Sequence, residues 1–114
     1  MSGKKKDEAR YLDAGGRLAQ APSTLLVETA FSRELAYADI LYEGISYADL
    51  AHVLMLLEAD VVPAEPGLAL LAALVELHDQ GIAALRLDAK WGDLYNNRDS
   101  ELQRRAPAAA GWLH

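Results

Sequence analysis

The sequence contains no cysteine and only one phenylalanine and two tryptophans among its 114 residues. Without cysteine there can be no disulfide framework, no thiol nucleophile and no thiolate metal site, and nothing requires an oxidising compartment. The sequence also lacks a glycine-rich phosphate loop of the P-loop or dinucleotide-binding type. These absences argue against cysteine-dependent enzymes, thiolate metal proteins and enzymes that bind nucleotides through such loops.

Positive charge is scarce. The net charge is −6, and the only basic cluster is Lys4 to Lys6. Phosphate binding requires a concentrated basic face, so we expect no nucleic-acid partner. Acidic residues, Asp7 and Glu8, follow the lysines in place of an apolar stretch. We therefore expect neither a signal peptide nor a membrane-spanning segment, and a cytoplasmic location.

Length and composition indicate one folded domain, because 52% of the residues are apolar and 25% are charged. Almost no window alternates with the period of a strand, and alanine and leucine dominate over valine and isoleucine. The sequence therefore predicts an all-α protein. We expect an extended arm over residues 1–22, in which Gly15 and Gly16 permit a turn, and a helical domain over residues 23–114.

Periodicity and helix-ending residues place the helices. Ser23 can cap a first helix, Pro63 and Pro66 separate a second helix from a third, and Gly81 ends or kinks the third. The later helices are expected over Leu35–Glu58, Leu68–His78 and Asp93–Arg105, the last closed by Pro107. The second helix has a predicted apolar face made of Tyr37, Leu41, Ile45, Ala48, His52 and Met55. The apolar positions of the second and third helices exceed what a domain of this size can bury alone.

The candidates for chemistry are few. His52, on the predicted apolar face, is interpreted as a packed histidine, and no residues have metal-ligand spacing. Four hydrogen-bonding residues, Asp93, Tyr95, Asn96 and Asn97, cluster at a predicted helix start. Regular helix should begin after Asp93, which can cap it, and the residues alone favour a capped polar turn over a binding site.

Several stretches resemble the argininosuccinate lyase family. The segments Gly92–Leu102 and Gly111–His114 are similar to the family pattern E-D-V-H-x-x-I-E-x-x-L followed by G-x-L-H-T-G-R-S-R-N-D. Upstream, Ala48–Glu65 resembles G-S-I-A-H-A-x-M-L-x-x-x-G-I-I-S-x-E, and Gly15–Arg17 resembles the opening W-G-G-R-F. The resemblance covers nearly the whole chain.

The resemblance implies the N-terminal helical domain of a homotetrameric enzyme several times longer, whose active sites each draw on three subunits. Its reaction is a β-elimination that releases fumarate from argininosuccinate, with no metal or organic cofactor. The catalytic serine would lie beyond this chain, so no catalytic residue is expected here and the chain alone should be inactive. The expected partners are a small-molecule substrate and the rest of its own chain. The arm at Gly15–Arg17 would meet the catalytic bundle or a neighbouring subunit.

Carried over by position, Asp93 matches a substrate-contacting aspartate, and Tyr95 stands where the family usually has a substrate-binding histidine. A phenol can hydrogen-bond a carboxylate but does not carry an imidazolium's positive charge at neutral pH. Glu34 and Ala38 stand where the family's N-A-S-I-x-x-D has its serine and aspartate. Two alternatives therefore remain open: a lyase for a different N-succinyl compound, and a non-enzymatic helical interaction module.

Overall fold

The computed structural model describes residues 20–114, and in this part of the chain all regular structure is helical, with no strand. The all-α prediction is thus confirmed. The predicted arm over residues 1–22 falls almost entirely outside the described residues, and so do Gly15 to Arg17.

The first helical segment consists of α2 (Thr24–Leu26), a π-helical turn η1 (Val27–Phe31) and α3 (Ser32–Leu35). Ser23 caps it as predicted, because its Oγ accepts a hydrogen bond of 3.2 Å from the backbone N–H of Leu26. A turn at Tyr37 separates α3 from the next helix, so the second helix begins at Ala38, three residues later than the sequence predicts.

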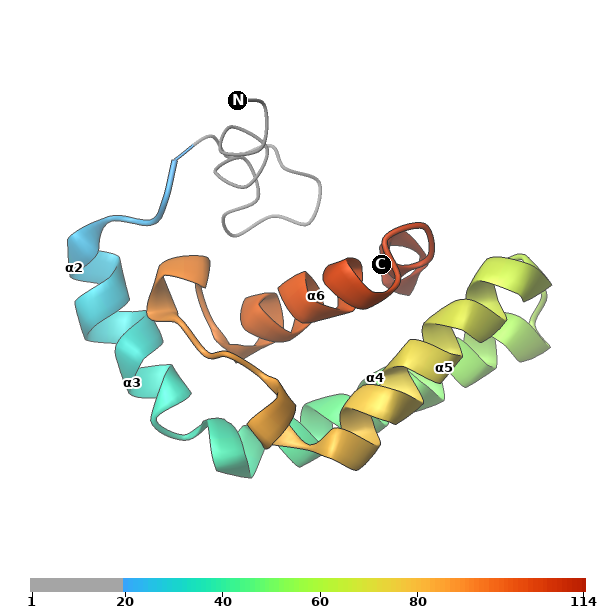
Figure 1. Ribbon diagram of the computed structural model, residues 1–114, viewed down its shortest axis with the longest axis horizontal. Coiled ribbons are helices and arrows are strands. Elements are labelled where there is room, and N and C mark those ends of the chain that lie inside the picture. The colour runs from blue at the N-terminus through green and yellow to red at the C-terminus, as the bar shows by residue number, and fades with distance from the viewer. Residues whose placement is uncertain (1–19) are drawn as a thin grey trace.

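The two longest helices, α4 (Ala38–Glu58) and α5 (Ala64–Gln80), form an antiparallel pair that lies side by side in Figure 1. Pro66 is tolerated in the first turn of α5, where its missing N–H would have no helical partner. The helices approach closely at Gly67, where a Cβ atom would lie 2.5 Å from Leu57 Cδ2. Gly81 ends α5 with a positive φ of 70°, as its sequence position indicated.

A connection with two short 3₁₀ turns, η2 (Ile82–Ala84) and η3 (Ala89–Trp91), leads from α5 to α6 (Leu94–Arg105). A final 3₁₀ turn, η4 (Ala110–Leu113), follows α6. Figure 1 shows α6 lying beside the α4–α5 pair, with the C-terminal end of the chain near the end of α6.

The core lies where α4, α5, α6 and η4 meet. Its buried members are Val53, Leu70, Ala73, Leu74, Leu77, Leu102, Ala109, Ala110 and Leu113. A second, smaller cluster joins the start of α4 to the start of α6 through Ala38, Tyr42 and Leu94. The two clusters are linked by Tyr42, whose hydroxyl donates a buried hydrogen bond of 2.8 Å to the carbonyl of Leu77.

The buried face of α4 differs from the predicted one. The buried residues are Ala38, Tyr42, Ser46, Asp49 and Val53. Each follows by one residue a member of the predicted face, so the helix is turned by about 100° from the expected orientation. The prediction that His52 is a packed core residue is accordingly wrong, because His52 is exposed. Apolar residues surround most of α4, and periodicity alone could not identify the packed side.

The opposite side of α4 carries an exposed apolar surface, which we call the outer face. It consists of Tyr37, Ile40, Leu41, Tyr47, Leu54 and Met55, with exposed fractions between 40% and 77%. Leu68 and Val75 of α5 are exposed as well. These residues agree with the expected excess of apolar positions, since contiguous apolar patches are characteristic of interfaces.

By length and hydropathy alone, α4 is also apolar enough to cross a membrane, although no such segment was expected from the sequence. It is the one helix of this kind within residues 20–114, and 22% of its apolar window is buried. A single helix of this kind is weak evidence for a membrane protein, because core helices of soluble proteins pass the same test.

The outer face leads to a prediction about association. The 114-residue chain should self-associate at high concentration, because residues such as Ile40, which is 77% exposed, gain from burial. Ile40→Gln should shift the population towards monomer in sedimentation velocity, whereas Glu43→Gln, also exposed on α4, should not. A wild-type chain that stays strictly monomeric at high concentration would contradict this expectation.

Candidate functional site

The start of α6 is organised by hydrogen-bonding side chains, as the sequence suggested. Regular helix begins at Leu94, and Asp93 caps it by accepting a bond of 2.8 Å from the N–H of Asn96 to Oδ1. Asn97 is buried and ties the preceding loop to the helix, since its amide donates to the carbonyls of Gly92 and Asp93 and accepts from the N–H of Asp88. The prediction that helix begins after Asp93 is confirmed.

A second carboxylate, from a distant part of the sequence, reaches the same helix end. Glu34 of α3 accepts a hydrogen bond of 3.4 Å from the N–H of Leu94 to its Oε1. A helix N-terminus favours negative charge, and both Glu34 and Asp93 satisfy backbone N–H groups there. Ala38, the other position at which the sequence departs from the family pattern, is buried against Leu94. The chain's own carboxylates thus hold the N-terminus of α6.

In the first two turns of α6, Tyr95 and Arg98 meet Asp49 of α4. The Tyr95 hydroxyl donates to Asp49 Oδ1 across 3.4 Å. The Arg98 guanidinium makes a salt bridge from Nη1 to Asp49 Oδ2, in which the two side chains are only 2% and 9% exposed. Together with Asp99 and His114, these three residues form what we call the polar cluster.

The Asp49–Arg98 salt bridge is buried and incompletely hydrogen-bonded. Among the described residues, Arg98 Nε and Nη2 have no hydrogen-bond partner, and the guanidinium carbon lies 5.9 Å from the centre of the Tyr42 ring. Removing two charges from water is costly, and an ion pair of this kind offsets that cost only in part. Either charge left alone would be strongly destabilising, so the pair fixes how α4 and α6 face each other.

Asp99 and His114 complete the polar cluster. Asp99 Oδ1 lies 3.0 Å from His114 Nε2, and its Oδ2 accepts a hydrogen bond of 2.8 Å from Gln103. The His114 ring also packs edge-on against Tyr95, with 6.0 Å between ring centres. Two carboxylates, one buried guanidinium and one histidine therefore surround Tyr95.

This environment raises the pKa of Tyr95 from 10.0 to about 12. Burial is the largest cause, followed by the negative charges of Asp49 and Asp99, and Arg98 opposes these effects only in part. The phenol is therefore neutral throughout the physiological pH range. Its proton is held more tightly than that of an ordinary tyrosine.

A second pair of polar side chains lies outside the polar cluster. His78 Nδ1 lies 2.8 Å from Ser46 Oγ, and its ring packs on Tyr47, which links α5 to α4. Ser46 is fully buried and His78 is partly exposed, so of this pair only the histidine ring reaches the surface. Residues 20–114 contain no group of three or more His, Asp or Glu side chains that could hold a metal ion.

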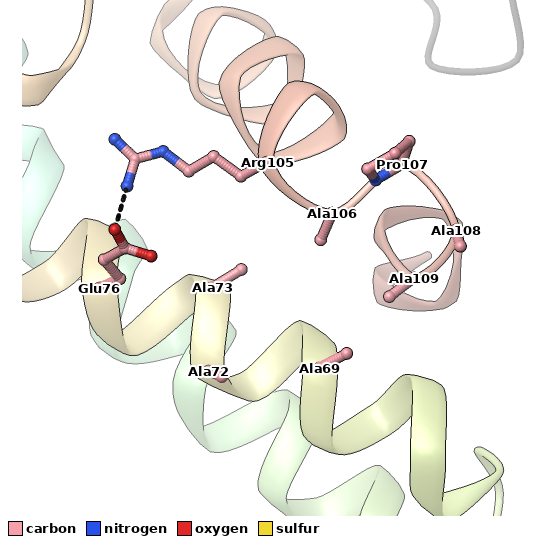
Figure 2. A pocket seen from close by; sticks show the side chains of 9 residues that line it. All are labelled: Ala69, Ala72, Ala73, Glu76, Arg105, Ala106, Pro107, Ala108 and Ala109. Atoms are coloured by element: carbon pink, nitrogen blue, oxygen red, sulfur yellow. Dashed lines mark ion pairs between the residues drawn. The ribbon is translucent and has the colours of Figure 1, made fainter.

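A hollow of about 360 Å³ lies between α5 and the segment after α6, away from the polar cluster (Figure 2). It is lined mostly by alanines, and Figure 2 shows the ion pair of Glu76 with Arg105 at one end, where Arg105 Nη1 lies 3.5 Å from Glu76 Oε1. A lining of alanines offers few hydrogen-bonding or charged groups to a ligand, so the hollow is the weaker candidate site.

The sequence interpretation singled out Asp93 and Tyr95 but not Asp49, Arg98 and Asp99, which the structure brings together with Tyr95. A signal for Arg98 was present, because it lies four residues from both Leu94 and Leu102 and so shares their helical face. An arginine on the apolar face of a helix requires a buried partner of opposite charge. The sequence alone does not identify which acidic residue provides it.

The buried salt bridge predicts strong and coupled effects on stability. Arg98→Leu should lower the free energy of unfolding by about 3 to 5 kcal/mol, because it leaves the Asp49 carboxylate buried without a partner. Adding Asp49→Ala to this variant should recover much of the loss. Denaturant titrations measure these free energies of unfolding. Arg104→Leu is the control, because the Arg104 side chain is 70% exposed in its ion pair with Glu101 and should contribute little to stability. Additive losses in the double variant would contradict the coupling.

The raised pKa of Tyr95 predicts a pH dependence at high pH. A group whose pKa is higher in the folded state stabilises the fold fully below its unfolded pKa, and this contribution disappears as pH rises through the folded value. For Tyr95 that window runs from about 10 to about 12. Formation of the Tyr95 phenolate changes the ultraviolet absorbance, and this part of the change is missing from the titration of Tyr95→Phe. The missing component should be centred near the upper end of this window. A missing component centred near pH 10 would show that neither burial nor the charges of Asp49 and Asp99 raise the pKa of the phenol.

Two curated proteins resemble the chain. It is 29% identical over 84 residues to the argininosuccinate lyase of Methanosphaera stadtmanae, an alignment that covers 74% of this chain and 18% of that protein. It is 28% identical over 101 residues to the argininosuccinate lyase of Methanocaldococcus jannaschii, covering 88% of this chain and 20% of that protein. No family profile and no solved structure matches the chain significantly.

The chain thus spans about a fifth of the length of the curated relatives that it matches. Both relatives are named as the same enzyme, and the aligned parts cover most of the present sequence. The comparisons confirm the resemblance that the sequence motifs indicated, which is to the argininosuccinate lyase family.

Proposed function

We propose that this chain is part of a carbon–nitrogen lyase that eliminates fumarate from an N-succinyl amino compound, with argininosuccinate as the first substrate to test. The observation that carries the proposal is the similarity to two argininosuccinate lyases over 74% and 88% of the chain. In this proposal the chain supplies substrate contacts, while the proton-transferring groups lie in other parts of the longer protein. The isolated chain is then inactive.

The proposed reaction is a β-elimination that needs no metal or organic cofactor. A base removes a proton from the carbon next to one carboxylate of the succinyl group, and the electron pair is held on that carboxylate as an aci-carboxylate. The pair then forms the carbon–carbon double bond as the C–N bond breaks, and the amine leaves with a proton. Fumarate and the free amine are the products.

Within this chain, the N-terminal end of α6 is the proposed place of substrate contact. Asp93 uses Oδ1 to cap the helix, and a carboxylate has capacity for further hydrogen bonds. Tyr95 is partly exposed, so part of its side chain can be reached from outside the domain. Asp93 and Tyr95 are therefore the proposed substrate-binding residues.

The apolar outer face of α4 supports the proposed assembly. Its residues include Ile40 at 77% and Tyr37 at 64% exposure, more than an isolated soluble domain usually leaves open over one helix. We propose that the rest of the longer protein, or a neighbouring subunit of a homotetramer, covers this face, and that the assembled enzyme is cytoplasmic.

The same outer face also fits the alternative of a non-enzymatic helical interaction module. The two proposals differ in a direct assay, because only the lyase releases fumarate. A third possibility is a lyase for a different N-succinyl compound. It is supported by two departures from the family pattern, Tyr95 in place of a histidine and Glu34 in place of a serine. The Glu34 carboxylate bonds to Leu94 N at the start of α6. Fumarate release from another N-succinyl compound, but not from argininosuccinate, would favour it.

The proposal predicts the kinetics of two variants in the full-length protein. Tyr95→Phe should lower kcat/KM by an amount equivalent to about 1 to 3 kcal/mol if the hydroxyl meets a buried substrate group. Asp93→Asn should lower it at least as much, and asparagine caps a helix about as well as aspartate, so the fold should survive. Fumarate release followed by ultraviolet absorbance measures both effects.

Asp79→Asn is the matched control, because Asp79 is exposed near the end of α5, outside both the polar cluster and the outer face, and should leave the kinetics unchanged. Failure of the wild-type full-length protein to release fumarate from any N-succinyl compound would reject the lyase proposal. Normal kcat/KM in both Asp93→Asn and Tyr95→Phe would show that these residues only shape the start of α6.

A further inference from the structure

The orientation of the Tyr95 hydroxyl determines what it can offer a ligand. Its hydroxyl lies 3.4 Å from Asp49 Oδ1, while Asp49 Oδ2 is engaged by Arg98 in the buried salt bridge. An ionised carboxylate can only accept hydrogen bonds, so the phenol must donate its single proton to Asp49. What remains on the hydroxyl is acceptor capacity.

The charged groups around Tyr95 favour the same kind of ligand. Arg98, the one guanidinium in the polar cluster, is 2% exposed and engaged by Asp49, so it is not available to a ligand carboxylate. The second carboxylate, Asp99, is paired with His114 and Gln103. A ligand carboxylate at Tyr95 would therefore find no donor on the hydroxyl and two carboxylates nearby, whose charge the one guanidinium offsets only in part.

Building on the lyase function proposed above, we infer that the Tyr95 hydroxyl accepts a hydrogen bond from an N–H group of the substrate's amine half, such as a guanidinium or ammonium group. Asp49 is the positioning residue, because it takes the phenol's proton and so turns the hydroxyl into an acceptor. Arg98 holds Asp49 in place. The sequence left a substrate carboxylate open as a partner of Tyr95, and the contact with Asp49 favours an N–H donor instead.

Binding of two opposite probes to the 114-residue chain tests the inference without turnover. Arginine offers guanidinium and ammonium donors, and fumarate offers only carboxylates. With tyrosine labelled by carbon-13 at the ring carbon that bears the hydroxyl, the Tyr95 signal is the one that disappears in Tyr95→Phe. Arginine should shift this signal saturably, and fumarate at equal concentration and ionic strength should not.

The variants make the result specific. Tyr95→Phe should weaken arginine binding by about tenfold, which is the loss expected for one hydrogen bond to a charged donor. Tyr37→Phe, at an exposed tyrosine outside the polar cluster, should leave arginine binding within about twofold. A shift of the Tyr95 signal with fumarate, a shift with neither probe, or unchanged arginine binding in Tyr95→Phe would each overturn the inference.

A second measurement separates this inference from the lyase proposal. In the full-length protein, Tyr95→Phe should raise the inhibition constant of arginine about tenfold while that of fumarate stays within about twofold. If fumarate inhibition weakens instead, the lyase proposal stands and the donor assignment is wrong. If the protein releases no fumarate but arginine still binds at Tyr95, the lyase proposal is wrong and the donor site stands.

Discussion

The buried salt bridge between Asp49 and Arg98 is the constraint on which the arrangement of the helices depends. It joins the middle of α4 to α6, two helices that are far apart in the sequence, at a point where both side chains are almost wholly removed from water. Neither charge can remain there without the other, because an unpaired buried charge costs several kcal/mol. The pair therefore selects the side of α4 that faces inwards.

The orientation of α4 that this salt bridge selects explains which of its apolar residues are exposed. Turning Ser46 and Asp49 towards α5 and α6 leaves the outer face, with Ile40 and Tyr37, exposed to its surroundings. A helix with apolar residues on two opposite sides is suited to a position between two packing partners. The domain provides one partner, and in the proposed assembly the longer protein would provide the other.

The same salt bridge prepares the candidate site. Asp49 shares its two oxygen atoms between Arg98 and the Tyr95 hydroxyl, so a structural ion pair also sets the hydrogen-bonding character of a partly exposed phenol. At the start of α6, Glu34 and Asp93 occupy backbone N–H groups that would otherwise attract an anion. Both features make the site receptive to hydrogen-bond donors, which bears directly on the amine half of the proposed substrate.

Local signals in the sequence determined much of this protein. The cap at Ser23, the interruption at Pro63, the end at Gly81 and the start of helix after Asp93 follow from interactions between near neighbours, and the all-α class follows from period and composition. The motifs around residues 48–65 and 92–102 indicated the family resemblance.

Only the tertiary structure decided which side of α4 is buried, because apolar residues surround that helix and periodicity gave no single answer. It also decided that His52 is exposed and that Tyr95 donates to Asp49, 46 positions away in the chain. The physical reason is common to these cases. Helix ends are set by short-range hydrogen bonds, whereas the partner of a buried charge is set by how distant helices pack.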